Sequence, residues 1–236
     1  MSENYNSQLM MGSRDQLLDD KQYGYLQFEQ GSLQKKYNEY LRSATDEADM
    51  QYFFENNPTL LPGLYDLHNG PLGDVVISKL KLANEYETDF AFISIDSATA
   101  QITFIEIESP KLKVFRSSDD QFTSGFNRSL QQARDWTLWV HQNPTYIKDV
   151  FREIYFKDVF RHQRVISRTI IVAGKRADIQ KTPEREKRWA GINHDSEPNA
   201  VVSYDRLGEK LHLNSRMLQL VCRTRWDVSQ LLRSRR

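Results

Sequence analysis

Cysteine is almost absent from this chain of 236 residues, which contains only Cys222. A single cysteine excludes an internal disulfide and a cysteine-rich zinc site, and it suits a reducing compartment. The five histidines are scattered without the spacing of metal ligands. The sequence also has neither a glycine-rich phosphate loop nor a Gly-x-Ser-x-Gly elbow. These absences argue against a zinc enzyme, a P-loop NTPase and an α/β-hydrolase.

Long apolar runs are lacking as well. No stretch approaches the ~20 apolar residues that a membrane-spanning helix needs. The first residues are polar and show no apolar segment of a secretory signal. We therefore expect a cytoplasmic protein that does not associate with a membrane.

Net charge is zero, but the charge is unevenly distributed along the chain. Residues 1–110 hold 7 Lys and Arg against 18 Asp and Glu, a net charge of −11, whereas residues 111–236 hold 25 against 14, a net charge of +11. Such asymmetry indicates contact between the basic half and a polyanion. Within the dense basic stretch 161–188, we expect Arg185, Lys187 and Arg188 to bind nucleic acid. The alternative is a solvated face that pairs with the acidic half.

Residues 89–136 form the most informative segment. Their pattern predicts strands at 89–95 and 102–108, a short turn between them, and a helix over 121–142. Side chains alternate faces along a strand, so Glu106 and Glu108 share one face. Two neighbouring carboxylates repel each other unless a cation, a proton or solvent relieves them. A divalent metal bound by oxygen ligands is one explanation; a strand that simply ends in solvent is the other.

The segment resembles the Shedu family of bacterial anti-phage proteins, whose core is similar to the PD-(D/E)xK nuclease fold. The similarity covers roughly residues 45–210 and rests on the order and spacing of several short motifs. These motifs are Phe53-Phe-Glu-Asn-Asn-Pro58, Thr88-Asp-Phe-Ala-Phe92, Phe104-Ile-Glu-Ile-Glu-Ser-Pro110, Gln132-Ala-Arg-Asp-Trp136, Ile170-Ile-Val-Ala-Gly-Lys175 and Val201-Val-Ser-Tyr-Asp-Arg-Leu207.

The resemblance implies a set of site residues. Asp89 and Glu106 would bind Mg²⁺ or Mn²⁺, with Glu55 on the preceding helix and Gln132 on the following helix at the edge of the site. The sequence departs from the nuclease pattern at Glu108, where that pattern has lysine. Either Glu108 joins the metal ligands, or it pairs with a lysine just beyond Pro110. We favour the second alternative, in which Lys111 or its neighbour Lys113 supplies the cation.

The resemblance also implies a fold, an α/β mixed sheet of the restriction-endonuclease type flanked by helices. We expect a helical extension over residues 1–44 and a nuclease-like domain over 45–236. Several segments are less clear from the pattern. Residues 15–42 read as one or two helices, 75–82 as a strand or a short helix, 174–198 as a mobile loop, and 207–225 as mostly helical.

Three functions fit the sequence. The first is a metal-dependent nuclease that cleaves DNA in phage defence and assembles as a homo-oligomer. The second is a catalytically silent nuclease fold that binds nucleic acid or a partner, because the expected lysine is missing. The third is an interaction module whose acidic face binds a protein. Cleavage that depends on Mg²⁺ or Mn²⁺ distinguishes the first, and salt-sensitive binding without cleavage distinguishes the second.

Overall fold

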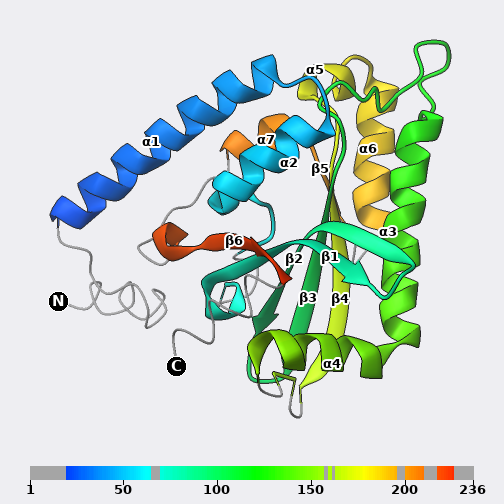
Figure 1. The fold of residues 1–236 in the computed structure, drawn as a ribbon. Coiled ribbons are helices and arrows are strands. Elements are labelled where there is room, and N and C mark those ends of the chain that lie inside the picture. The colour runs from blue at the N-terminus through cyan, green and yellow to red at the C-terminus, as the bar shows by residue number, and fades with distance from the viewer. Residues whose placement is uncertain are drawn as a thin grey trace, which may run out of the picture.

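The computed structural model describes residues 20–64, 70–156, 159–160, 163–195, 200–209 and 217–225. Six strands form one mixed sheet at the centre (Figure 1). Their order across the sheet is β5-β4-β3-β2-β1-β6; the pairs β1–β2 and β2–β3 are antiparallel, and the other three are parallel. The strands are β1 (Val75–Leu82), β2 (Tyr86–Ile95), β3 (Thr99–Ile107), β4 (Arg164–Val172), β5 (Ala200–Val202) and β6 (Val221–Thr224).

Helices cover both faces of this sheet (Figure 1). One apolar cluster joins the sheet to α1, α2 and α7, and a second joins it to α3 and α4. The helices are α1 (Asp20–Ser43), α2 (Glu47–Asn56), α3 (Ser124–Gln142), α4 (Pro144–Tyr155), α5 (Arg176–Ile179), α6 (Pro183–Asp195) and α7 (Tyr204–Glu209), with 3₁₀ turns at Pro58–Leu60, Leu72–Asp74 and Met217–Gln219. This arrangement confirms the expected fold class, a nuclease-like α/β fold with a mixed sheet flanked by helices.

Local sequence signals account for the central hairpin and the helix that follows it. Asp96 begins the β2–β3 turn, where its Oδ1 accepts hydrogen bonds from the backbone N–H groups of Ala98 and Thr99 at 2.7 and 2.5 Å. A short acidic side chain that binds the backbone two or three residues ahead is typical of such turns. Thr123 caps α3 by accepting a hydrogen bond from the Phe126 N–H at 3.3 Å.

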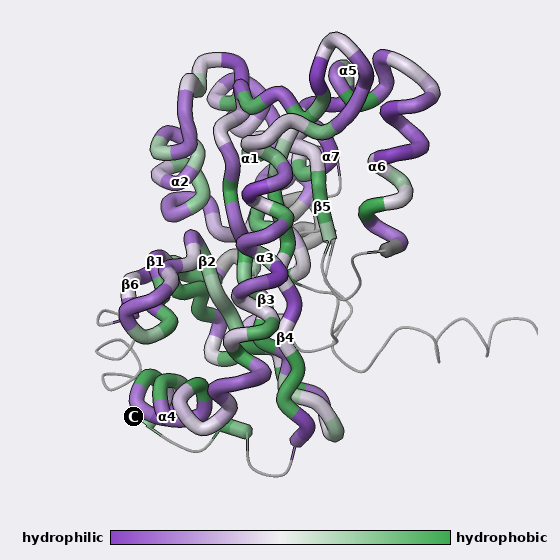
Figure 2. Tube along the Cα trace, turned by 90° about the vertical axis from the view of Figure 1, so that its right-hand side faces the viewer, coloured by the Kyte–Doolittle hydropathy of each residue, from purple (hydrophilic) through white to green (hydrophobic). Residues whose placement is uncertain are grey.

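Hydropathy follows the layers of the fold. In Figure 2 the central strands carry long green runs, whereas α6 is mainly purple. None of the described helices combines the length and the apolar character required to cross a bilayer.

Two expectations about the basic half are wrong. Residues 174–198 were expected to form a mobile loop, but this stretch contains α5 and α6. The Thr182 hydroxyl accepts a hydrogen bond from the Arg185 N–H, and Pro183 occupies the first turn of α6. The apolar pattern did not predict α6, because part of its inner face is occupied by the buried Arg185 instead of an apolar residue. The second error concerns 221–224, which pair as β6 with β1 instead of continuing a helix.

Cys222 is buried in β6, as expected for a residue that packs in the core. Residues 15–42 were expected to form one or two helices, and from Asp20 they belong to the single helix α1. Residues 75–82 are a strand, which settles the other ambiguous segment.

Candidate metal and phosphate site

Three charged residues lie in a row across adjacent strands. The β1–β2 pairs Ser78–Phe90 and Leu80–Thr88 flank Lys79 and Asp89, which therefore face each other. One step beyond the β2–β3 pair Phe90–Ile105, the same register brings Glu106 to the other side of Asp89. Side chains directly opposite each other in antiparallel strands have Cβ atoms about 4.5–5.5 Å apart. The sheet therefore brings together residues separated by 10 and by 17 positions in the sequence, and we call them the charged row.

Lys79 reaches this row through an unusual backbone conformation. Its φ of +50° lies in the left-handed region, which non-glycine residues rarely adopt. The kink interrupts the alternation of β1, because Ile77 and Leu80 belong to the same apolar cluster although they are three residues apart. The Lys79 Nζ lies 2.5 Å from Asp89 Oδ1. Rare backbone conformations persist where the surrounding structure holds them, often at functional sites.

Asp89 is 4% exposed and uses both carboxylate oxygens within the protein. Its Oδ1 pairs with Lys79, and its Oδ2 accepts a hydrogen bond from the Ile107 N–H at 2.7 Å. Burial by itself would lower the pKa of Lys79, but the hydrogen bond and the negative charge of Asp89 outweigh burial and raise that pKa. Lys79 is therefore a stable ammonium at neutral pH.

Glu106 is the most strongly perturbed carboxyl in the site. Burial is the main cause, followed by the charges of Asp89 and Glu108, and together they raise the pKa of Glu106 to about 10. Glu47, at the start of α2, contributes further negative charge. Loss of hydration and the charge of Asp89 also raise the pKa of Glu47 itself. The charged row and its neighbours thus contain more carboxylates than Lys79 neutralises.

Glu108 is fixed from two sides. Its Oε1 accepts a hydrogen bond from the Ser129 hydroxyl on α3, and its backbone carbonyl accepts one from the Tyr204 hydroxyl at the start of α7. Burial raises the pKa of Glu108, although the hydrogen bond from Ser129 opposes this shift. In the structure, the side chain that replaces the expected lysine is held by a serine and lies near Asp89.

The three remaining candidates for the catalytic site, Glu55, Gln132 and Lys111, differ in their relation to the charged row. Glu55 accepts a hydrogen bond from Gln51 Nε2 at 3.0 Å, and the same nitrogen lies 3.4 Å from the Asp89 carbonyl oxygen. Gln132 is one helical turn beyond Ser129 on α3, so the two share a face of that helix. The Lys111 side chain is exposed. Hydrogen bonds from Thr45 are the main cause of the lowered pKa of Asp49, to which the charge of Lys111 adds a smaller contribution.

The three basic candidates differ in exposure. Arg185 was expected to bind nucleic acid, but it is 2% exposed and forms ion pairs with Asp120 and Asp178 at 2.6 and 2.5 Å. Its guanidinium also lies 5.2 Å from the centre of the Phe115 ring. Arg185 therefore stabilises the fold, and its burial removes it from a surface that could contact DNA.

Lys187 is exposed, as a phosphate contact requires. Arg188 is partly buried, and its Nη2 pairs with Glu184 at 3.0 Å. A second basic stretch, residues 233–236, and the polar stretch 1–12 lie outside the described residues.

Four residues of the site were not predicted from the sequence: Glu47, Lys79, Ser129 and Tyr204. Lys79 alternates with leucines in Lys79-Leu-Lys-Leu82, which reads as the solvent face of a strand. Lys79 differs from Lys81 because it faces Asp89 on the neighbouring strand. That pairing is set by the register of the sheet and cannot be recognised from the sequence alone. The sequence does contain a signal for Ser129. It precedes Gln132 by one helical turn, so both residues were expected on the same face of α3.

The donor set suits a hard divalent cation. Among the described residues, no three His, Cys, Asp or Glu side chains are arranged to hold an ion between them. Mg²⁺ needs fewer protein ligands, because it is usually bound by one or two carboxylates together with water and substrate phosphates. Asp89 and Glu106 provide such a pair of oxygen donors. Burial, and then the negative charges of Asp89 and Glu108, raise the pKa of Glu106, and a bound cation would oppose both effects.

One comparison with known families gave a match. The family described as the C-terminal part of the Shedu protein SduA matches residues 44–207, which include every residue of the charged row. No curated protein matches the chain at a significant level. The matched segment begins at the end of α1 and ends within α7, and it covers more than half of the chain. The chain therefore belongs to the Shedu family.

Proposed function

We propose that this protein is a metal-dependent nuclease that cleaves DNA as part of Shedu anti-phage defence in the cytoplasm. The observation that carries the proposal is the charged row, in which an ammonium and two carboxylates meet on three adjacent strands. Nucleases of this kind need oxygen ligands for Mg²⁺ or Mn²⁺ beside a cation that can contact the phosphate. Assembly into a homo-oligomer is part of the same proposal.

The roles follow from the positions of the side chains. Asp89 and Glu106 would hold the metal, which when bound supplies Lewis-acid stabilisation of the phosphate and an activated water. Lys79 would donate a hydrogen bond to a phosphate oxygen, because its ammonium has further N–H groups beyond the one that faces Asp89. Glu108, oriented by Ser129, would accept a hydrogen bond from the attacking water, and Gln132 would line the edge of the site.

We assign the motif cation to Lys79 rather than to Lys111. The Lys79 ammonium is 2.5 Å from the central aspartate, whereas the Lys111 side chain is exposed. The lysine would thus come from a neighbouring strand instead of the position that Glu108 occupies. This choice makes Lys79 the sharpest test of the proposal.

The test is a cleavage assay on supercoiled, linear and single-stranded DNA with Mg²⁺, with Mn²⁺ and with EDTA. We expect Asp89→Asn and Lys79→Met to reduce the rate by about 100-fold or more, the size of effect seen when one transition-state donor is lost. Lys81→Met is the matched control, because Lys81 is an exposed lysine two residues along the same strand. Lys79→Arg keeps the charge, and circular dichroism verifies the fold of each variant.

The outcomes separate the parts of the proposal. Full activity of Lys79→Met would move the cation role back to Lys111 or Lys113. Absence of cleavage by the wild-type protein on every form of DNA with either metal would refute the nuclease proposal.

One observation favours a second function, a silent nuclease fold that binds nucleic acid. Both Asp89 oxygens are already engaged by Lys79 and the Ile107 N–H. With a pKa of about 10, Glu106 is protonated at neutral pH in the absence of a cation. If this arrangement persists with metal present, DNA binding would be salt-sensitive, independent of Mg²⁺ and unaccompanied by cleavage.

A further inference from the structure

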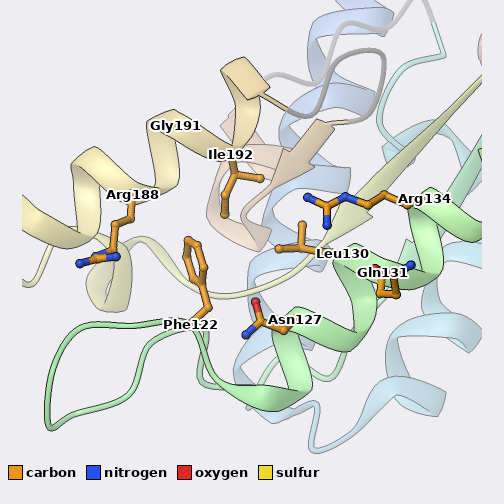
Figure 3. Close-up of a pocket in the computed structure, with 8 residues that line it drawn as sticks. All are labelled: Phe122, Asn127, Leu130, Gln131, Arg134, Arg188, Gly191 and Ile192. Carbon is orange, nitrogen blue, oxygen red and sulfur yellow. The ribbon is translucent and has the colours of Figure 1, made fainter.

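A separate pocket lies between α3 and α6, on a different face of α3 from Ser129. It has a volume of 540 Å³, within the range of about 300–1,000 Å³ that is typical of small-molecule sites. Figure 3 shows Phe122, Leu130 and Ile192 facing one another across its centre, with Arg134 reaching over Leu130 and Arg188 at the end beyond Phe122. We call it the α3–α6 pocket.

The pocket is positively charged. Arg134 and Arg188 line it from opposite helices, and none of its lining residues is acidic. Arg188 is oriented from outside the pocket, because its Nη1 donates to Gln121 Oε1 at 3.0 Å and its Nη2 pairs with Glu184. The buried Nε of Arg188 has no hydrogen-bond partner among the described residues. That nitrogen is closed to solvent, so the exposed Arg134 is the lining guanidinium that a phosphate oxygen can reach.

The floor of the pocket is apolar and held in place by aromatic contacts. The Phe122 ring lies 5.2 Å from the Phe115 ring and 5.2 Å from the Phe126 ring. Phe126 in turn stacks on Trp189 at 6.1 Å. A fixed phenyl face in a pocket that a guanidinium group also lines suits a planar ring that carries an anionic group.

Two amides complete the lining. Gln131 and Asn127 lie on α3 along the same side of the pocket (Figure 3). The Gln131 Nε2 donates to Asp135 at 2.8 Å, which leaves its carbonyl oxygen as an acceptor. Amide side chains can bind the donors and acceptors at the edge of a nucleobase. The pocket thus offers an aromatic face for a base, amide groups for the edge of the base and a guanidinium group for a phosphate.

We propose that the α3–α6 pocket binds a nucleoside phosphate, either as a free nucleotide or as a nucleotide within a strand. The base would stack on Phe122 between Leu130 and Ile192, and Arg134 would hold the phosphate, with Arg188 adding positive charge at the opposite end of the pocket. This site is distinct from the charged row, so its occupancy does not require metal or cleavage.

Gly191 provides a sharp test. It lines the pocket from α6, and a Cβ added there meets no atom within 4 Å. Gly191→Leu would therefore add an apolar side chain at the pocket wall with room for its Cβ, and replacement of a helical glycine favours the helix. Gly31→Leu on α1 is the matched control, because a Cβ at that helical glycine also meets nothing within 4 Å.

Binding is measured by isothermal titration calorimetry with the four ribonucleoside triphosphates and, separately, with a single-stranded deoxyoligonucleotide. We expect saturable binding that Gly191→Leu weakens at least tenfold and Arg134→Gln weakens by about tenfold, the loss of one charge-assisted hydrogen bond. Gly31→Leu should bind like the wild-type protein. The two arms show whether the free nucleotide, the strand or both supply the ligand.

Two results would overturn the inference. One is the absence of saturable binding of every triphosphate and of the oligonucleotide at about 1 mM. The other is an affinity of Gly191→Leu equal to that of the wild-type protein. Asp89→Asn should bind the free triphosphates as the wild-type protein does when no divalent metal is present, so failure of the nuclease proposal leaves this inference unaffected, and each can be refuted alone.

Discussion

At the residue scale, Glu106 shows how the site depends on protons as well as on charge. Its folded-state pKa of about 10 lies far above the ordinary 4.5 of a glutamate. Neutral Glu106 therefore stabilises the folded state fully below about pH 4.5. This contribution declines as pH rises towards 10, because the unfolded chain releases the proton first. A bound cation would reverse the preference by favouring the ionised form.

Glu106→Gln tests this linkage. The amide keeps the shape of the neutral acid but never ionises, so the variant should melt at least about 3 °C above the wild-type protein at pH 8–9. The difference in Tm should shrink towards zero near pH 4.5. Differential scanning fluorimetry from pH 4.5 to 9 without divalent metal measures both values. A difference that is constant with pH would show that Glu106 ionises normally in the folded protein.

At the element scale, α1 belongs to the fold although the family match begins after it. Tyr37 on α1 is completely buried, and its hydroxyl donates to the Tyr204 carbonyl at 2.7 Å. Tyr204 in turn donates to the carbonyl of Glu108. Gln34 adds a hydrogen bond of 2.6 Å to the Gly208 carbonyl on α7. The expected helical extension is thus connected, through α7, to the end of the strand that carries Glu106 and Glu108.

Substitutions in α1 should show this connection. Tyr37→Ala should lower the free energy of unfolding by about 3–5 kcal/mol, because it opens a cavity the size of an aromatic ring. Tyr37→Phe should cost about 1–2 kcal/mol, since it removes one buried hydrogen bond. Phe28→Ser is the control; Phe28 is 70% exposed, and we expect a change within about 0.5 kcal/mol. Urea unfolding measures all three free energies. An unchanged free energy of unfolding for Tyr37→Ala would show that α1 does not contribute to the stability of the fold.

At the scale of the whole molecule, the acidic and basic halves of the sequence share one sheet. Strands β1, β2 and β3 come from the acidic half, and β4, β5 and β6 come from the basic half. The β3–β4 ladder joins the halves along its whole length, and β6 returns to pair with β1. Some of the basic residues neutralise acids within the fold, as Arg185 does, and others remain on the surface.

DNA affinity as a function of salt concentration should separate these two classes. Lys187→Gln should weaken binding and reduce the slope of log K against log salt by about one, because one phosphate contact is lost. Arg185→Gln should leave the slope unchanged and instead lower the free energy of unfolding by about 3 kcal/mol. This is the low end for a broken buried ion pair, because Asp120 and Asp178 retain access to water. An unchanged slope for Lys187→Gln would show that Lys187 is a solvated surface residue that does not contact a phosphate.

The sequence by itself determined the features that depend on neighbouring residues. Alternating apolar residues predicted the strands that hold Asp89 and Glu106, and helical periodicity predicted α3. The order of short motifs predicted the family and, with it, the class of fold. All of these patterns act within about twenty residues, so they can be recognised without knowledge of the sheet.

The tertiary structure decided which distant residues meet. Lys79 faces Asp89 because of strand register and a left-handed kink, and β6 completes the sheet from the far end of the chain. Arg185 looks like a surface cation in the sequence, and only the positions of Asp120 and Asp178 reveal it as a buried one. A charge is stable in the interior only where partners converge on it. This convergence depends on how distant elements pack together. The local spacing of residues in the sequence does not reveal that packing.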